Sequence, residues 1–145
     1  MGAANKNIGE AFLLVWKFPQ NLIYKDTHGL PHVDPTNKEV NIIADLALFS
    51  FLKVIAKINK LRHILEYSRN EKLLEKLPEF KVNMGFGLHF GWAIEGAIGS
   101  EFKIDASYLS PNVNIASRLE AATRQYGVSI LISGQVYEML SSKVK

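Results

Sequence analysis

The chain has 145 residues, and 48% of them are hydrophobic, which is enough for one domain with a packed core. The formal net charge is only +3 and the lysines and arginines are dispersed, so the composition argues weakly for a nucleic-acid partner and not at all for a membrane surface. The absence of cysteine excludes disulfides and thiolate metal sites and fits an intracellular setting.

The first elements are two predicted strands, over residues 4–9 and 11–18, which are joined at Gly9-Glu10. The second strand is nearly all apolar, so we expect it to be central and covered on both faces. The turn leaves the carboxylate of Glu10 at its tip. Residues 19–37 carry prolines and a glycine among polar residues, a composition typical of a loop.

A long helix is predicted over residues 38–67, with Thr36 or Asn37 as its N-cap. Its apolar residues recur at helical spacing and should pack against a sheet. The stripe consists of Val40, Ile43, Ala47, Phe51, Val54, Ile58 and Leu61. The most apolar run, residues 42–58, is interrupted by charged residues, so we expect no membrane span in this chain.

Two more strands are predicted over residues 81–90 and 92–99, after a short helix over residues 71–77, and they would form a hairpin that turns near Gly91. The pair is rich in glycine, which weakens a strand, so we expect another backbone to approach it closely. Residues 102–108 form a further extended segment.

A helix is predicted to begin at Ser110-Pro111, because a serine N-cap followed by proline is a typical helix start. It should run to about Gln125 and end at Gly127. Asn114 and Arg118 lie four residues apart and therefore project from one face, where an amide and a guanidinium suit a phosphate-bearing ligand. On spacing alone, two solvated side chains on an ordinary helix are the commoner explanation.

The chain ends in a predicted buried strand, residues 128–132, and a helix over residues 134–140. The order of elements predicts an α+β fold, a ferredoxin-like sandwich with a mostly antiparallel sheet. RNA-recognition modules share this fold, but residues 84–90 lack a basic residue before Gly85 and have Leu88 where an aromatic should be. We therefore expect no nucleic-acid partner.

Three segments resemble, in the right order, sequence motifs of the class III nucleotidyl cyclases. Residues 6–12 are similar to that family's K-x-I/L-G-D hairpin, and residues 87–99 to its glycine-rich strand pair. Residues 113–120 resemble its V-N-x-A-S-R helix start. Residues 44–48 and 130–133 match the helix and the later strand, so the resemblance covers nearly the whole chain.

The resemblance implies the same sandwich and a reaction that turns a nucleoside triphosphate, ATP or less favourably GTP, into the 3′,5′-cyclic monophosphate and pyrophosphate for intracellular signal transduction. In that family the ribose 3′-hydroxyl attacks the α-phosphate, and two divalent ions, Mg²⁺ or Mn²⁺, are held by two aspartates. The active site lies between two catalytic domains. The implied partner is therefore a second cyclase domain, in a homodimer or a heterodimer.

On the same resemblance, Asn114 would orient the ribose and Arg118 would stabilise charge on the α-phosphoryl group, and such donors contribute about 3 kcal/mol each. Lys6 and Ser107 fall on the two purine-selecting positions. There a lysine donates to adenine N1 and a serine accepts from the exocyclic amine, so both residues favour ATP. Glu10 falls on the second metal-binding aspartate.

Two departures from the family keep an alternative open. Glu10 is a glutamate where the family has aspartate, and Ser110-Pro111 replaces its Gly-Asp pair. The family's first metal-binding strand would lie upstream of residue 1, and its triphosphate-binding lysine beyond Lys145. We interpret residues 1–145 as a single, partial cyclase domain on the cytoplasmic face, with membrane attachment through flanking domains left open. The alternative is a catalytically inactive cyclase-homology module that dimerises with a competent cyclase domain and regulates it.

Overall fold

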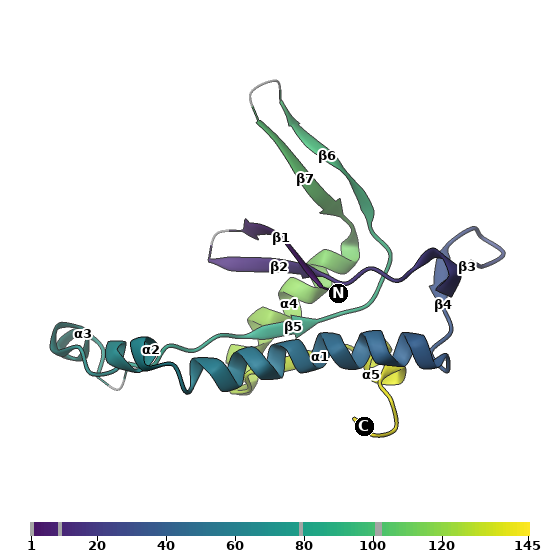
Figure 1. The fold of residues 1–145 in the computed structure, drawn as a ribbon. Helices are drawn as coiled ribbons and strands as arrows, with labels where there is room; N and C mark the ends of the chain where they lie inside the picture. The colour runs from purple at the N-terminus through teal and green to yellow at the C-terminus, as the bar shows by residue number, and fades with distance from the viewer. Residues whose placement is uncertain (1, 9, 79, 101–102) are drawn as a thin grey trace.

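The chain combines helices with short strands, as Figure 1 shows for the computed structural model, which describes residues 2–8, 10–78, 80–100 and 103–145. This confirms the predicted α+β class. In chain order the elements are β1 (Ala3–Ile8), β2 (Ala11–Val15), the 3-10 helix η1 (Gln20–Leu22), β3 (Ile23–Lys25), β4 (Pro31–Val33), α1 (Lys38–Ile58), α2 (Arg62–Tyr67), α3 (Glu71–Lys76), β5 (Phe86–Leu88), β6 (Ile94–Ser100), β7 (Lys103–Leu109), α4 (Pro111–Tyr126), β8 (Ile130–Ile132) and α5 (Gly134–Met139). Among the described residues, no helix has both the length and the apolar character to cross a bilayer.

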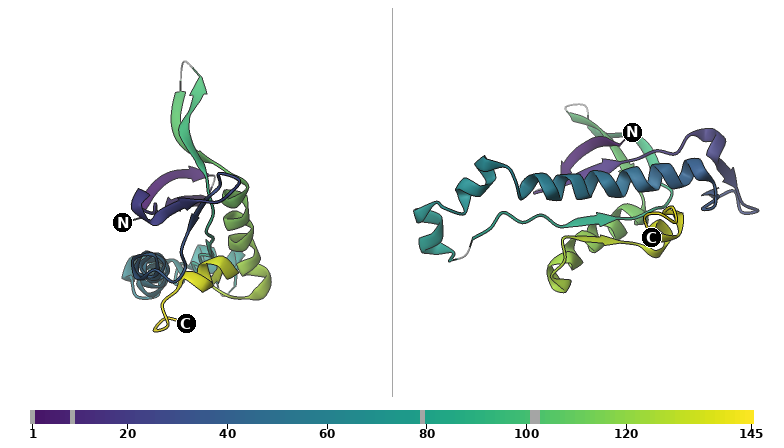
Figure 2. Two further views of the ribbon diagram at one scale, coloured as in Figure 1. Left: turned by 90° about the vertical axis from the view of Figure 1, so that its right-hand side faces the viewer. Right: turned by 60° about the horizontal axis from the view of Figure 1, so that its bottom comes forward.

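The strands form four separate two-stranded sheets in the described part of the chain. The pairs β1–β2, β3–β4 and β6–β7 are antiparallel, whereas β5 and β8 are parallel. Most pairs are therefore antiparallel, as predicted, but these residues do not form one continuous sheet. The β6–β7 hairpin projects away from the helices (Figure 2).

The predicted hairpin between residues 81–90 and 92–99 is wrong. β5 pairs instead with β8, and β6 pairs with β7. The chain does not turn back after β5, because the Trp92 carbonyl accepts hydrogen bonds from the side chains of Ser110 and Asn112 at the start of α4. These bonds hold the connecting segment against α4 before β6 begins.

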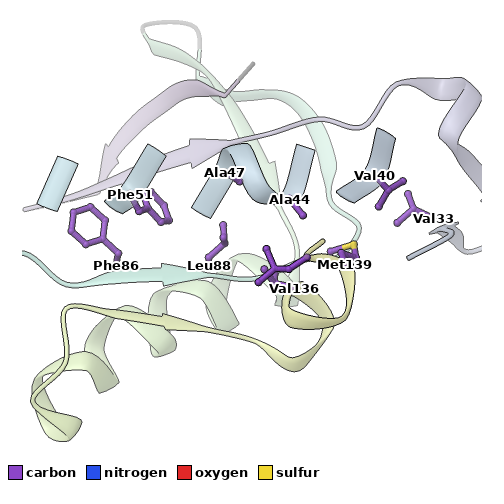
Figure 3. Close-up of a cluster of buried hydrophobic side chains, with 10 residues drawn as sticks. Val33, Val40, Ala44, Ala47, Phe51, Phe86, Leu88, Val136 and Met139 are labelled. Carbon is purple, nitrogen blue, oxygen red and sulfur yellow. The ribbon is translucent and has the colours of Figure 1, made fainter. Parts of the chain in front are cut away.

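The core lies between α1, β5 and α5 (Figure 3). α1 turns one apolar stripe toward β5, because its members recur at intervals of three or four residues. The buried members of this stripe are Val40, Ala44, Ala47 and Phe51. The Phe51 ring lies 5.0 Å from the Phe86 ring of β5 and 5.4 Å edge-on from the Trp16 ring, so the segment after β2 is joined to the core.

The helix predicted over residues 38–67 is two helices. Of the two candidate N-caps the structure has Asn37, whose side-chain oxygen accepts a backbone hydrogen bond of 2.8 Å in the first turn of α1. At the other end of α1 the Asn59 side chain donates to the Ile55 carbonyl. Such local side-chain bonds compete with the helical pattern, and α2 starts afresh three residues later.

Two expectations about strand burial are also wrong. The strand predicted over residues 11–18 is not covered on both faces: in the described part β2 pairs with β1 alone, and Phe12 is 62% exposed. The strand predicted over residues 128–132 is half-buried rather than buried in its β8 portion. Both strands lie in two-stranded sheets, so each has one edge without a partner strand in the described part of the chain.

Residues 19–37, predicted as a loop, contain the β3–β4 hairpin. Its turn is closed by the Asp26 carboxylate, which accepts hydrogen bonds from the backbone N–H groups of His28 at 2.9 Å and Leu30 at 2.8 Å. Gly29 has a φ of 78°, a conformation that favours glycine in this turn. The loop composition was therefore the signature of a tight turn between short strands.

Candidate active site

The start of α4 is built as the sequence predicts. The Ser110 hydroxyl accepts a hydrogen bond from the Asn112 backbone N–H at 3.0 Å, and Pro111 occupies the first helical position. The helix ends at Tyr126, and Gly127 follows in the left-handed conformation with a φ of 65°. The helix that carries the two predicted phosphate-facing residues is therefore defined at both ends.

Asn114 and Arg118 lie one turn apart on α4, and both are exposed. Neither side chain makes a hydrogen bond or an ion pair with a residue that the structure describes. The other side of α4 packs against β5, so the helix presents the amide and the guanidinium away from the core. The geometry leaves both groups free to contact a ligand, and their role in binding stays a prediction.

α4 lies directly on β5 because two glycines leave room for it. A Cβ atom on Gly87 would overlap the Ala116 carbonyl oxygen, and one on Gly85 would overlap the Thr123 hydroxyl. This is the close backbone approach that the glycine-rich sequence predicts. The contact sets the position of α4 relative to the core.

Asn112 anchors the start of α4 to the segment between β5 and β6. Its Oδ1 lies 3.1 Å from His89 Nε2, and its Nδ2 donates to the Trp92 carbonyl at 2.9 Å. Gly91 makes room, because a Cβ atom there would overlap the Asn112 carboxamide. Sequence reasoning missed this residue. The available signal is an asparagine just after the Ser110 cap, but nothing local shows that it meets residues much earlier in the chain.

The two predicted purine-selecting positions lie on neighbouring strands, β1 and β7. Ser107 of β7 is buried, with 6% of its surface exposed. Lys6 belongs to β1, and its side chain lies outside the part of the chain that the structure describes. The Asn5 Nδ2 donates to the Ala106 carbonyl at 3.1 Å, so the structure joins the two strands beside both positions.

Glu10, the predicted metal ligand, is exposed at the turn between β1 and β2. It makes no hydrogen bond or ion pair with a described residue. Within the described ranges there is no group of three histidine, aspartate or glutamate side chains placed to hold a metal ion. Divalent ions take several oxygen ligands, so this one carboxylate does not form a metal site by itself.

An ion pair links the segment after β2 to the β6–β7 hairpin. Lys17 Nζ lies 2.6 Å from Glu95 Oε1, and the Tyr108 hydroxyl donates to the same oxygen at 2.9 Å. The hydrogen bond from Lys17, followed by that from Tyr108, lowers the pKa of Glu95. The pKa of Lys17 is raised, chiefly by its bond to Glu95. Lys17 and Tyr108 also line a small pocket together with Asn5.

Sequence comparison with known proteins reveals relatives over most of the chain. The family model described as Adenylate and Guanylate cyclase catalytic domain matches residues 4–145. Adenylate cyclase 1 of Rhizobium meliloti (strain 1021) is 36% identical over 81 residues, which are 56% of this chain and 12% of that protein. The adenylate cyclase of Anabaena cylindrica is 39% identical over 61 residues, which are 42% of this chain and 12% of that protein.

The fold is also similar to a solved structure. A bacterial light-regulated adenylyl cyclase superposes with a TM-score of 0.62 and 26% sequence identity, over 97% of this chain and 32% of that chain. The chain therefore spans a third or less of the length of these relatives. Since the family model matches almost every residue and the fold agrees, the chain belongs to the adenylate and guanylate cyclase catalytic domain family.

Proposed function

We propose that the chain is the part of an adenylyl cyclase catalytic domain that binds ATP and promotes its conversion to 3′,5′-cyclic AMP and pyrophosphate. The observation that carries the proposal is the pair Asn114 and Arg118 on α4. Both side chains are exposed and without a partner among the described residues, while the other side of the helix is fixed against β5. An amide and a guanidinium held by a rigid element are preorganised donors for a triphosphate.

Asn114 and Arg118 each have one role in the proposed reaction. The reaction forms a bond between the ribose 3′-oxygen and the α-phosphorus and breaks the bond from that phosphorus to the oxygen that bridges to the β-phosphate. Pyrophosphate is the leaving group, and the proton of the 3′-hydroxyl is released to solvent. The Arg118 guanidinium donates to the α-phosphoryl oxygens, where negative charge increases in the transition state. The Asn114 amide hydrogen-bonds the ribose and holds its 3′-hydroxyl in line for attack.

We infer ATP rather than GTP from Lys6 and Ser107. A lysine ammonium group donates to adenine N1, whereas guanine presents an N–H donor at that position. A serine hydroxyl accepts from the exocyclic amine of adenine. The two sequence relatives carry adenylate cyclase names, which supports the same choice.

In this proposal a second cyclase domain completes the active site, in a homodimer or a heterodimer. The projecting β6–β7 hairpin exposes apolar side chains, with Ile94 at 62%, Ile104 at 71% and Leu109 at 63%. Exposed apolar surface of this kind marks interaction sites. The partner would cover the hairpin, and the complete domain would have the ferredoxin-like sandwich that the family resemblance implies.

No step of the proposed reaction is assigned to a metal ion held by this chain alone. The Mg²⁺ or Mn²⁺ pair that the resemblance implies needs a second carboxylate beside Glu10, and the described residues contain no group of three acidic or histidine side chains that could hold an ion. In this proposal the second carboxylate comes from outside residues 1–145.

Arg118→Ala in the full-length protein tests the proposed function. We expect formation of cyclic AMP from Mn-ATP to fall at least about 100-fold, the usual effect of removing one preorganised donor. Arg124→Ala is the matched control, because Arg124 lies on the same helix but pairs with Glu120 at 3.2 Å. Its rate should stay within about twofold of wild type.

Two other results would change the proposal. A rate unaffected by Arg118→Ala contradicts the role assigned to Arg118. Binding of ATP without turnover by the wild-type protein favours the alternative, a catalytically inactive cyclase-homology module that regulates a competent domain. This alternative is retained because Glu10 is exposed and makes no hydrogen bond or ion pair with a described residue.

A further inference from the structure

Asn5 occupies an irregular position in β1. The register with β2 advances by two residues along β1, from Ala4 to Lys6, while it advances by one along β2, so Asn5 is the extra residue of a β-bulge. A bulge re-aims the side chain at that point. The Asn5 Nδ2 donates to the Ala106 carbonyl of β7 at 3.1 Å, across 101 positions of the chain.

Stability does not explain an asparagine at this position. The Asn5 Oδ1 atom is buried and accepts no hydrogen bond from a described residue. A buried acceptor without a partner destabilises a fold by at least as much as one ordinary hydrogen bond stabilises it. A better explanation for the asparagine is that its Nδ2 donor fixes the position of β1 relative to β7.

The Asn5 hydrogen bond lies next to both proposed purine-selecting residues. Asn5 directly precedes Lys6 in β1, and Ala106 directly precedes Ser107 in β7. β1 and β7 belong to different two-stranded sheets, so in the described part no ladder of backbone hydrogen bonds sets their spacing. The side-chain bond is therefore placed to hold the two positions at a fixed distance.

We propose that Asn5 is a positioning residue that sets the spacing between Lys6 and Ser107 and thereby controls discrimination between ATP and GTP. The inference rests on the proposed function of those two residues. Both have to meet one purine ring, so a shift of β1 against β7 separates the donor at N1 from the acceptor at the exocyclic amine. The Lys17–Glu95 pair restrains the same hairpins, but an exposed ion pair holds geometry only weakly.

Asn5→Leu in the full-length protein tests this inference, because leucine approximates the shape of asparagine and removes both ends of the amide. The ratio of kcat/KM for ATP to kcat/KM for GTP should fall about fivefold, as expected for one hydrogen bond. The Tm should stay the same or rise, because the unpaired buried oxygen is removed as well. A merely structural role would lower the Tm and leave the ratio intact.

Two further variants complete the comparison. Asn21→Leu is the matched control, since Asn21 is exposed and makes no side-chain hydrogen bond with a described residue, and its ratio should stay within about twofold of wild type. Asn5→Asp replaces the donor by an oxygen that repels the Ala106 carbonyl, so the ratio should fall at least as far as in Asn5→Leu. A wild-type ratio in both folded Asn5 variants overturns the proposal. Failure of both to fold also overturns it, because the role is then structural.

Measurements on the wild-type protein distinguish a failure of this inference from a failure of the proposed function. If it forms cyclic AMP and the Asn5→Leu ratio is unchanged, the positioning role is wrong and the function stands. If it binds ATP without cyclising it, the same comparison is made on the ratio of Kd values for ATP and GTP. Binding of neither nucleotide overturns both proposals.

Discussion

The Glu95 carboxylate accepts hydrogen bonds from Lys17 and Tyr108, and these bonds lower its pKa below the ordinary value of 4.5. A group with a lowered pKa stabilises the fold above its unfolded pKa and loses that contribution as the pH falls through its folded pKa. We therefore predict that Glu95→Gln lowers the free energy of unfolding at neutral pH. The difference in the free energy of unfolding between this variant and wild type should shrink as the pH falls below 4.5. The difference is small, because both charged side chains are more than half exposed.

Urea denaturation at neutral and acid pH measures this difference. Glu75→Gln is a suitable control, because Glu75 is exposed and makes no ion pair with a described residue, and its effect should stay near zero throughout. A Glu95→Gln difference of the same size at both pH values contradicts the prediction.

Residues with a local role could be predicted from the sequence, and residues that act through distant contacts could not. Ser110 and Gly127 act within their own turn of chain, so their residue types are sufficient evidence. Asn112 and Asn5 act through bonds to residues remote in the sequence, which no local pattern encodes. Arg118 lies between these cases: the family resemblance suggests the role that we propose for it, and the structure adds that its side chain is exposed.

The contact between β5 and α4 depends on Gly87, because a side chain there meets the backbone of the helix. We predict that Gly87→Ala lowers the free energy of unfolding by about 1–3 kcal/mol, the usual effect of overpacking. Gly96→Ala is the matched control, because it also lies in a strand but a Cβ atom there would meet nothing within 4 Å. Gly96→Ala should change the free energy of unfolding by no more than about 0.5 kcal/mol in urea denaturation. Equal changes in the two variants would show that β5 does not contact α4 so closely.

The sequence predicted the helices and strands better than it predicted which strands pair with one another. The start of α1 and both ends of α4 were predicted, since caps and apolar spacing are local signals. The parallel pairing of β5 with β8 was missed, because alternation of apolar residues identifies a strand and not its neighbour. The β3–β4 hairpin was missed because each of its strands has three residues, too few to show an alternating pattern.

The molecule as a whole leaves much apolar surface uncovered. The large apolar side chains on β2, α1, β6 and β7 that are more than half exposed are Phe12, Ile42, Leu46, Phe49, Ile94, Ile104 and Leu109. Apolar surface on this scale marks sites of interaction, and in the proposed dimer a second cyclase domain would cover it. The exposed apolar surface of β2 was not predicted, because the sequence pattern placed this strand in the centre of one sheet. The second domain was expected only from the family resemblance.

We propose, above all, that this family member cyclises ATP. Product analysis of the full-length wild-type protein with Mn-ATP tests this proposal. We expect cyclic AMP and pyrophosphate in equal amounts, because one bond to the α-phosphorus replaces another. ADP with inorganic phosphate, or no product from a folded protein that binds ATP, would contradict it.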